Sequence, residues 1–554
     1  MEHSSSVQRV WILYLSVAMA LMTASLAAQT DPGARPTGSA IVFAVPDGHG
    51  NTINDTAQVP PTDAQACAPL SSTEPVPQVA GCFLPNLNGP QTTLWFAGLI
   101  TFGDLVSVRG ISSSSTNPEP IAGLGTFYNG NSCAMCHLQP AIGGSSPGVG
   151  TPFFTVNPQF AVATHRGAIN TPPAFVHRND GPIVEARFVL NIDSNGNPLT
   201  TADGSVHELY TIEGRDDAPP GCNVPQDPFF ATEVSDNNLI LRTPTPTYGL
   251  GFVETTSDLT LQKNLIASQG LGFGTGGRFN TSGNDQTITR FGWKAQNPSL
   301  LMFAGEASNV EMGVTNELFP FEKSPGDCAT NRTPEDLTAP NSSTAVTLNP
   351  IVLDSDIEAL AFFMFTNAAP AQCDFQSGVN GSGQPFCNSL GASAVRGQSQ
   401  FVTIGCSSCH TPQLTTGPSA FTDLNNATFQ PFSDFALHHM GSKLVDGINQ
   451  GQAGPDEFRT APLWGLGQRR FFMHDGRTKD LVAAIELHKS LPSNCTDVTS
   501  VSESFLLNGS PVQIQPQSTQ SCGSDANQVI QNFDNLVTNN PQGAQDLLNF
   551  LRSL

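Results

Sequence analysis

Apolar residues recur at helical spacing in several stretches of the chain, most clearly in its second half. A helix is expected over residues 356–365, where Asp354 or Ser355 would cap the first turn. Another is expected over residues 394–402. The last begins at Pro541, after a capping asparagine, and reaches the C-terminus. These stretches predict helices that each bury one apolar face.

One further helix carries a candidate ligand on its apolar side. It follows Thr478, which is expected to cap it, and runs to about residue 489. Positions i, i+3, i+4 and i+7 form its stripe: Leu481, Ala484, Ile485 and His488. Because such a stripe faces inward, His488 is either a hydrogen-bonded core histidine or a ligand.

Shorter apolar runs predict strands. They span residues 184–190, 208–212 and 239–242. Gly and Pro, 51 and 43 in number, indicate many loops around such runs. Upstream, residues 29–92 are rich in Pro, Thr, Gly and Ala and predict an irregular extension.

The first 28 residues have the pattern of a secretory signal. Arg9 precedes an apolar run over residues 10–26, and Ser25-Leu26-Ala27 fits a small-x-small cleavage site. A retained membrane anchor is the alternative. No later stretch is apolar and long enough to span a bilayer. We therefore expect a periplasmic or secreted protein with no stable membrane span after cleavage.

Charge narrows the range of partners. The 554 residues include 46 Asp and Glu but only 23 Lys and Arg, which gives a net charge of −23. This balance does not suit nucleic acid, whose phosphates bind cations. It suits an exported protein, and it would attract a basic redox protein by charge complementarity.

The cysteines fall into two groups. Of the 12, four belong to two short motifs and eight remain. An even remainder in an exported chain suggests disulfides, although spacing does not fix their connectivity. Pairing near neighbours joins Cys67 with Cys82, Cys373 with Cys387 and Cys495 with Cys522, which leaves Cys222 with Cys328.

Both short motifs read C-x-x-C-H. They are Cys133-Ala134-Met135-Cys136-His137 and Cys406-Ser407-Ser408-Cys409-His410. Thiols three residues apart lie on one side of a helical turn, where both can add to the vinyl groups of one porphyrin. The next residue, a histidine, can then bind the iron. The repeat predicts two covalently bound haem c groups, against the alternative of zinc knuckles or redox dithiols.

Other side chains are candidates for the opposite face of each iron. His165 and His177 follow the first motif, and each is either a ligand or an ordinary histidine. Near the second motif, His438 and Met440 compete with His488 for this position.

Further segments resemble the bacterial di-haem cytochrome c peroxidase superfamily, and within it the di-haem oxidoreductase branch. The matching segments are residues 123–125, 131–137, 185–188, 290–295, 311–313, 458–466, 473–477 and 548–554. The resemblance implies a mainly α fold with two cytochrome c-like haem domains, over residues 93–350 and 351–554, and loop-rich and short β insertions.

The resemblance also implies roles for single residues. His488 matches the sixth ligand of the C-terminal haem, and Trp293 matches an aromatic residue between the haems. Glu311 matches an acid over the N-terminal haem, where it would move protons during peroxide cleavage. An inter-domain calcium site is matched by Asn170, Thr460 and Pro462.

Two departures from the peroxidases bear on activity. Leu301 stands where a glutamine often accompanies the distal acid, and no histidine stands at the spacing after His137 at which peroxidases place a removable ligand. The second departure argues against redox-gated opening of the N-terminal haem.

The expected function is reduction of hydrogen peroxide at the N-terminal haem. A small redox protein would supply the electrons, and the C-terminal haem would relay them. The alternative is a di-haem oxygenase or oxidase that acts on an organic or protein substrate. A third interpretation is a non-catalytic electron-transfer cytochrome.

Overall fold

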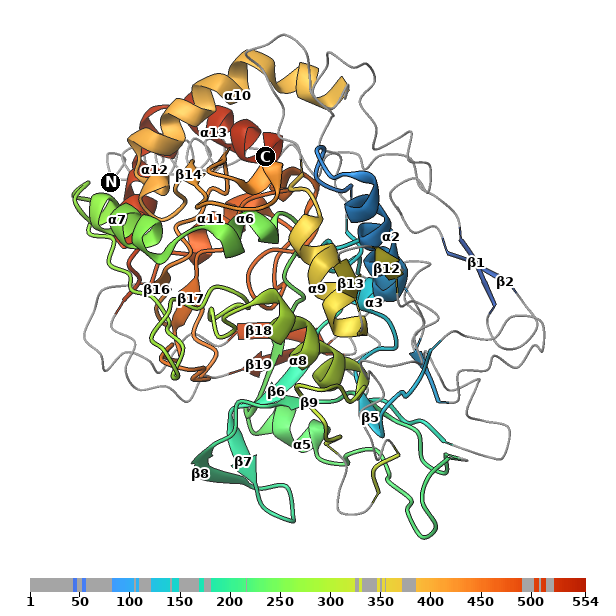
Figure 1. Cartoon of the computed structure of the whole chain (residues 1–554). Coiled ribbons are helices and arrows are strands. Elements are labelled where there is room, and N and C mark those ends of the chain that lie inside the picture. The colour runs from blue at the N-terminus through green and yellow to red at the C-terminus, as the bar shows by residue number, and fades with distance from the viewer. Residues whose placement is uncertain are drawn as a thin grey trace, which may run out of the picture.

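Short sheets stand beside the helices throughout the protein (Figure 1). The computed structural model describes residues 43–46, 52–55, 82–103, 106–108, 121–139, 142–148, 169–173, 181–215, 217–323, 328–330, 346–348, 351–353, 355–370, 385–490, 503–507, 510–514 and 523–554. This part is 35% helical and 15% strand, with 11 helices and several small sheets. The expectation of a mainly α fold is therefore wrong, because many pairs of very short strands accompany the helices.

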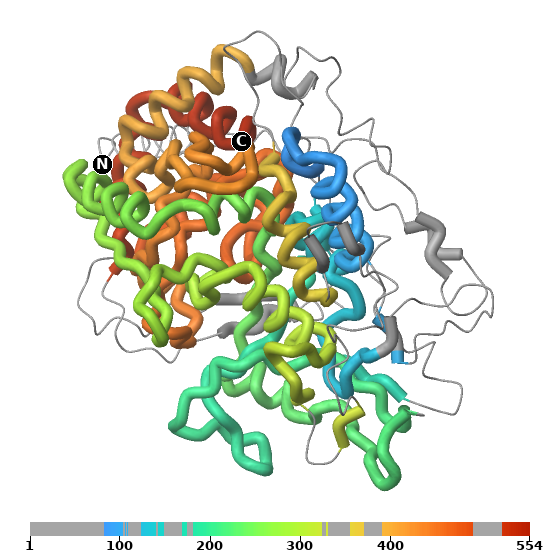
Figure 2. Tube along the Cα trace, viewed as in Figure 1, coloured from blue at the N-terminus to red at the C-terminus, as the bar shows by residue number. Residues whose placement is uncertain are grey.

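One group of helices packs around a core that both halves of the chain supply. It contains α2 (Gly89–Gly103), α6 (Leu250–Thr255), α8 (Leu300–Met312) and α9 (Asp356–Thr366). The Ser355 hydroxyl caps α9 by accepting the Glu358 N–H at 3.3 Å. Figures 1 and 2 show α9 against α2, and a side chain at Gly98 of α2 would collide with the backbone of α9. The domain boundary near residue 350 remains a prediction.

A second group lies at the C-terminal end. The long helix α10 (Pro385–Thr403) packs along α13 (Pro541–Ser553), with α11 (Leu481–Leu487) and α12 (Asn527–Asn539) in the same core. The predicted start of α13 is confirmed, since the Asn540 side chain accepts the Gly543 N–H at 3.0 Å.

The predicted cap of α11 is wrong. The carboxylate of Asp480 caps the helix by accepting the Ala483 N–H at 3.0 Å. Thr478 lies two residues earlier, where its hydroxyl accepts the Asp480 N–H. Thr and Asp are both favourable N-cap residues. Which of the two caps the helix therefore depends on where packing of the buried stripe makes the helix begin.

The insertion between the two motifs is built on a three-stranded antiparallel sheet in the order β11–β6–β9. Its strands are β6 (Glu185–Phe188), β9 (Val206–His207) and β11 (Leu239–Arg242). Two of them lie in the predicted runs 184–190 and 239–242, whereas the predicted run 208–212 contains Tyr210–Thr211, a strand of another sheet. Every second residue of β6 is buried, as expected for a strand with one face on the core. This region forms the lower part of Figure 1.

The remaining elements are short. They are β1 (Phe43–Pro46), β2 (Thr52–Asp55), β3 (Val106–Ser107), β4 (Ile121–Ala122), β5 (Phe127–Tyr128), α3 (Cys133–Cys136), β7 (Leu190–Ile192), β8 (Pro198–Ala202), β10 (Tyr210–Thr211), α5 (Phe230–Ser235), α7 (Asp258–Gln269), β12 (Val346–Leu348), β13 (Ile351–Leu353), η3 (Cys406–Ser408), β14 (Leu414–Thr415), η4 (Thr422–Leu424), β15 (Thr428–Phe429), β16 (Leu437–His439), β17 (Glu457–Arg459), η5 (Leu466–Gln468), β18 (Glu503–Leu507) and β19 (Ser510–Ile514).

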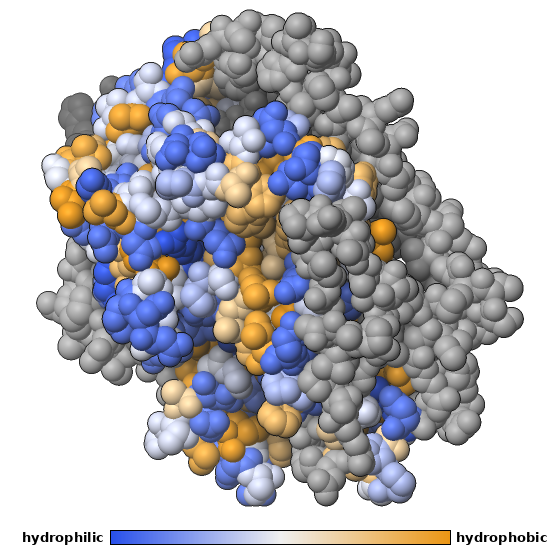
Figure 3. All heavy atoms as spheres, viewed as in Figure 1, coloured by the Kyte–Doolittle hydropathy of each residue, from blue (hydrophilic) through white to orange (hydrophobic). Residues whose placement is uncertain are grey.

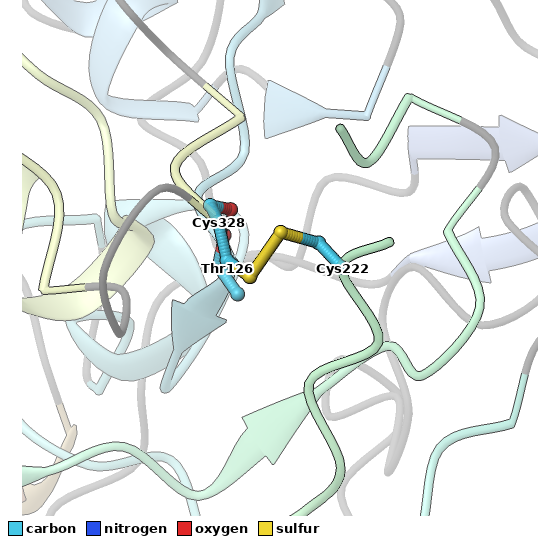
Figure 4. The surroundings of a disulfide bond; sticks show 3 residues. All are labelled: Thr126, Cys222 and Cys328. Atoms are coloured by element: carbon cyan, nitrogen blue, oxygen red, sulfur yellow. Dashed lines mark hydrogen bonds between the residues drawn. A yellow bond between two sulfur atoms is a disulfide. The ribbon is translucent and has the colours of Figure 1, made fainter. Parts of the chain in front are cut away.

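A disulfide joins Cys222 to Cys328 across 106 residues of the insertion, which confirms that predicted pair (Figure 4). The Thr126 hydroxyl donates a hydrogen bond to the Cys328 carbonyl at 3.3 Å beside it. Cys82 is also disulfide-bonded, and its predicted partner, Cys67, lies outside the described residues. The other two predicted pairs also involve undescribed residues.

Figure 3 shows hydrophilic residues over much of the face in view, with a band of hydrophobic residues through its middle. None of the described helices is both long and apolar enough to cross a bilayer. The predicted signal, residues 1–28, lies outside the described part of the chain.

Candidate functional site

The first C-x-x-C-H motif forms a single helical turn, α3. The His137 N–H donates to the Cys133 carbonyl at 3.0 Å, which closes the turn. The Nδ1–H of His137 donates to the Gly144 carbonyl at 3.1 Å, so that its Nε2 is left as an acceptor. Burial lowers the pKa of His137 to about 4. A neutral imidazole with its other nitrogen anchored in this way is the usual form of an iron ligand.

The second motif has the same design on η3. Gly405 precedes it with a φ of 101°, and a Cβ there would lie 2.6 Å from the Phe273 ring, so glycine is required. The Nδ1–H of His410 donates to the Phe432 carbonyl at 2.9 Å. Burial lowers its pKa to about 4 as well. In both motif histidines the Nδ1–H is therefore bonded to a backbone carbonyl, which makes Nε2 the acceptor nitrogen.

Each motif opens into its own cavity. The N-cavity is lined by Cys133, Cys136 and His137, and the C-cavity by Cys406, Cys409 and His410. Among the described cysteines these four are free thiols. Paired thiols beside a neutral imidazole, inside a largely apolar cavity, fit a covalently attached haem in each cavity.

Trp293 lines both cavities. Its Nε1–H donates to the Thr243 carbonyl at 2.7 Å, and its carbonyl accepts the Arg459 N–H at 2.9 Å. The His474 ring lies edge-on to the indole, with 6.4 Å between ring centroids, and stacks on Phe458. The indole is thus held in the wall shared by the two sites.

Glu311 lies in the N-cavity at the C-terminal end of α8. Its carboxyl accepts a hydrogen bond from Asn129 Nδ2 at 2.9 Å, and its backbone carbonyl accepts the Asn129 N–H at 2.7 Å. The helix end fits closely against the preceding loop, because a Cβ on Gly125 would lie 2.5 Å from Gly313. Glu311 is thereby held near the first motif.

Burial raises the pKa of Glu311 to about 8, and the nearby charge of Glu185 adds to the rise. Glu185 forms an ion pair with Arg187 at 2.6 Å. Burial alone would raise the pKa of Glu185, but Arg187 and Arg242 outweigh it, so the pKa is lowered. Within the Glu185–Glu311 pair, the proton at neutral pH is therefore on Glu311, and Glu185 is ionised.

Three of the predicted ligands meet in the C-cavity, which His438, Met440 and His488 all line. The Nδ1–H of His488 donates to the Ala484 carbonyl at 2.7 Å, and its Nε2 stays free. His438 has both nitrogens engaged, with Asp434 at 3.0 Å and Asp525 at 3.4 Å. This geometry favours His488 over His438 as an iron ligand, and Met440 remains a rival.

Two arginines in the wall of the C-cavity have no carboxylate partner among the described residues. Arg459 donates to the Gly292 carbonyl at 2.9 Å, and Arg469 contacts the Pro462 carbonyl. Burial lowers the pKa of each to about 10. A buried guanidinium group is stabilised by hydrogen bonds to an anion, so these two arginines are suited to bind the propionate groups of a haem.

The three predicted calcium ligands have different surroundings: Thr460 lines the C-cavity, whereas Asn170 and Pro462 line neither cavity. Asn170 donates to the Tyr128 hydroxyl at 3.1 Å, whereas the Thr460 carbonyl accepts from Ser433 at 2.6 Å. The calcium site of Asn170, Thr460 and Pro462 stays a prediction. Leu301 is 39% exposed, and His165 and His177 lie outside the described residues.

Sequence reasoning missed several residues of the two cavities. Glu185 and Arg187 lie in a segment that resembles the superfamily, but no role was predicted for them. Their contact with Glu311 exists only in the folded chain. Gln296 lines the N-cavity, and its Oε1 is buried without a hydrogen-bond partner among the described residues.

A sequence model of a family described as di-haem oxidoreductase, putative peroxidase, matches residues 233–495. The match covers slightly less than half of the chain. It contains the second motif, Trp293, Glu311 and His488, and it begins downstream of the first motif. No curated protein matches the chain.

Proposed function

We propose that this chain, which matches the di-haem oxidoreductase family over residues 233–495, attaches two haems covalently and reduces hydrogen peroxide at the N-terminal one. In this proposal the protein is exported, a small basic redox protein donates electrons, and the C-terminal haem relays them. Bound haem would supply the iron for peroxide binding and for electron transfer.

The proposal rests on one observation: the two cavities share one wall but are lined by different functional side chains. Trp293 lines both of them, whereas Glu311, a carboxyl group that is protonated at neutral pH, lines the N-cavity alone. A proton donor on one side and an aromatic ring between the sites suit chemistry at the first motif and electron supply from the second.

In the N-cavity, Cys133 and Cys136 would hold the porphyrin and His137 would face its iron. Glu311 is the side chain placed to give a proton to an oxygen atom in this space. Asn129 orients it by a hydrogen bond at 2.9 Å. A general acid is most effective when its pKa is close to the working pH, and burial has brought the pKa of Glu311 to about 8.

In the C-cavity, Cys406 and Cys409 would hold the second porphyrin between His410 and His488. Arg459 and Arg469 would pair with its propionates. Two imidazole ligands leave no position for peroxide, so this site would carry electrons only.

Replacing His488 by Ala is expected to convert the ferric C-terminal haem from low spin to high spin, because its iron loses one of two imidazoles. His438→Gln is the matched control, since His438 lines the same cavity but has both nitrogens bonded to carboxylates. EPR spectra of the two variants show which of the two histidines binds the iron. A high-spin signal in His438→Gln, or an unchanged spectrum in His488→Ala, would assign the ligand elsewhere.

Replacing Trp293 by Leu is expected to slow electron transfer between the haems about tenfold, equivalent to about 1.4 kcal/mol of barrier. The aromatic ring between the sites is lost while both haems are kept. Rapid mixing of reduced protein with peroxide, followed at the C-terminal haem, measures this rate.

Trp464→Leu is the control for Trp293→Leu. The Trp464 Nε1–H also donates to a backbone carbonyl at 2.7 Å, but this residue lines neither cavity. Equal rates in the two variants would remove Trp293 from the electron route.

A further inference from the structure

Two carboxyl groups meet in the wall of the N-cavity. Glu185 comes from β6 and Glu311 from the end of α8, and their side chains are hydrogen-bonded to each other. Both line the cavity together with His137. A carboxylate has no donor hydrogen, so this bond requires one proton on the pair.

The surroundings place that proton on Glu311. Arg187 Nε donates to Glu185 at 2.6 Å, and Arg242 lies opposite Glu185 on the neighbouring strand β11. Glu311 instead accepts a hydrogen bond from the neutral amide of Asn129. Cations favour the ionised form of Glu185, whereas no cation is bonded to Glu311 among the described residues.

The other charges around the pair are partly neutralised. Arg242 Nε donates to Asp446 at 3.1 Å, so its charge is shared with a second carboxylate. Glu306, five residues before Glu311 on α8, also interacts electrostatically with Arg187 and lines the cavity. Arg187 is therefore the cation on which the state of Glu185 depends most directly.

Glu185 is the acid hydrogen-bonded to Glu311, and through Arg187 it is connected to the rest of the insertion. The side chain of Glu185 is 18% exposed and that of Arg187 is 11% exposed, and both border the N-cavity. We propose that Glu185 is the proton-relay partner of Glu311, which it recharges with a proton from solvent after each transfer to an oxygen atom in the N-cavity. This inference rests on the proposed peroxide reduction.

The chemistry balances with one proton carried at a time. Conversion of one hydrogen peroxide to two water molecules breaks the O–O bond and consumes two electrons and two protons. The redox partner supplies the electrons by way of the C-terminal site. Glu311 gives its proton to the departing oxygen and becomes a carboxylate beside Glu185. Two adjacent carboxylates favour uptake of a proton, which restores the pair for the second transfer.

The experiment uses the protein with both haems and the variants Glu185→Gln, Arg187→Gln and Glu213→Gln. The C=O stretch of protonated carboxyl groups is followed by infrared spectroscopy against pH. Peroxide consumption, with an artificial reduced donor, is measured over the same range. Glu213→Gln is the control, because Glu213 belongs to the same insertion but does not line the cavity.

In the unmodified protein, the carboxyl band and the rate are expected to fall together as pH rises through about 8, where Glu311 loses its proton. Glu185→Gln should move both transitions to lower pH by about one unit, because a neighbouring negative charge is gone and Arg187 is released. It should also slow turnover at neutral pH at least about tenfold. Arg187→Gln should move the transitions in the opposite direction, and Glu213→Gln should move neither.

Unchanged transitions in Glu185→Gln would overturn the relay. If Glu185→Gln folds poorly, Arg187→Gln still tests the relay, because its two pH transitions are expected to move to higher pH. If the unmodified protein consumes no peroxide, the proposed function fails, and with it the relay to peroxide. The infrared titration still reports separately whether Glu185 and Glu311 share a proton.

Discussion

Replacing Glu311 by Gln is expected to lower peroxide turnover by about 10²- to 10⁴-fold, the range that loss of a general acid–base group usually costs. Glutamine has nearly the same shape and can keep the hydrogen bond to Asn129, but it can neither give nor take a proton. Haem content and the spectrum of the C-terminal haem should stay the same. Steady-state peroxide consumption measures the effect.

Glu254→Gln is the matched control for Glu311→Gln. Glu254 is also an acid whose pKa is raised by burial, and it accepts the Leu300 N–H at the start of the same helix, α8. It lines neither cavity, so its replacement should leave turnover within about twofold, as expected for a site without catalytic contact. Glu311→Asp should retain part of the activity. Full activity in Glu311→Gln would show that another group moves the proton.

Replacing Cys406 and Cys409 together by Ser is expected to remove the C-terminal haem and abolish turnover with an external donor. The apolar C-cavity, about 210 Å³, would then lose its occupant. At about 24 cal/mol per Å³ of cavity, the loss amounts to about 5 kcal/mol of folding free energy. A typical domain is stable by only about 5–15 kcal/mol, so the variant should unfold at a much lower temperature.

Intact mass, haem absorbance and thermal unfolding measure this result. Replacing the disulfide pair Cys222 and Cys328 by Ser is the control, because it also removes two sulfur atoms. That change should cost about 2–5 kcal/mol by freeing a long loop, but both haems should stay attached. Retention of two covalent haems by the Cys406 and Cys409 variant would contradict the assignment of the motif.

Local signals in the sequence were sufficient for several helices. Ser355 caps α9, and Asn540 with Pro541 begins α13, because caps act within a few residues of the helix they start. Very short strands escaped notice. Residues 437–439 form β16, which pairs with β17 some 20 residues later. A three-residue strand has no periodicity to detect, so the helical content was overestimated.

The residues of the candidate site also divide into those predictable from local sequence and those that only the fold brings together. The C-x-x-C-H motifs and the stripe containing His488 are local, and both were visible in the sequence. The pairing of Glu185 with Glu311 joins residues far apart in the chain, and the fold brings them together. That Arg459 and Arg469 are buried without a carboxylate partner among the described residues can be seen only in the folded protein. Cys222 with Cys328 was found by elimination, since the other cysteines had nearer partners.

The most direct measurement is an electronic and EPR spectrum of the oxidised protein during titration with hydrogen peroxide. A peroxide-reducing N-terminal haem should give a high-spin ferric signal that changes as peroxide is added, while the low-spin signal of the C-terminal haem reports electron loss. Two low-spin signals that peroxide leaves unchanged, before and after partial reduction, would contradict the proposal and indicate an electron-transfer cytochrome.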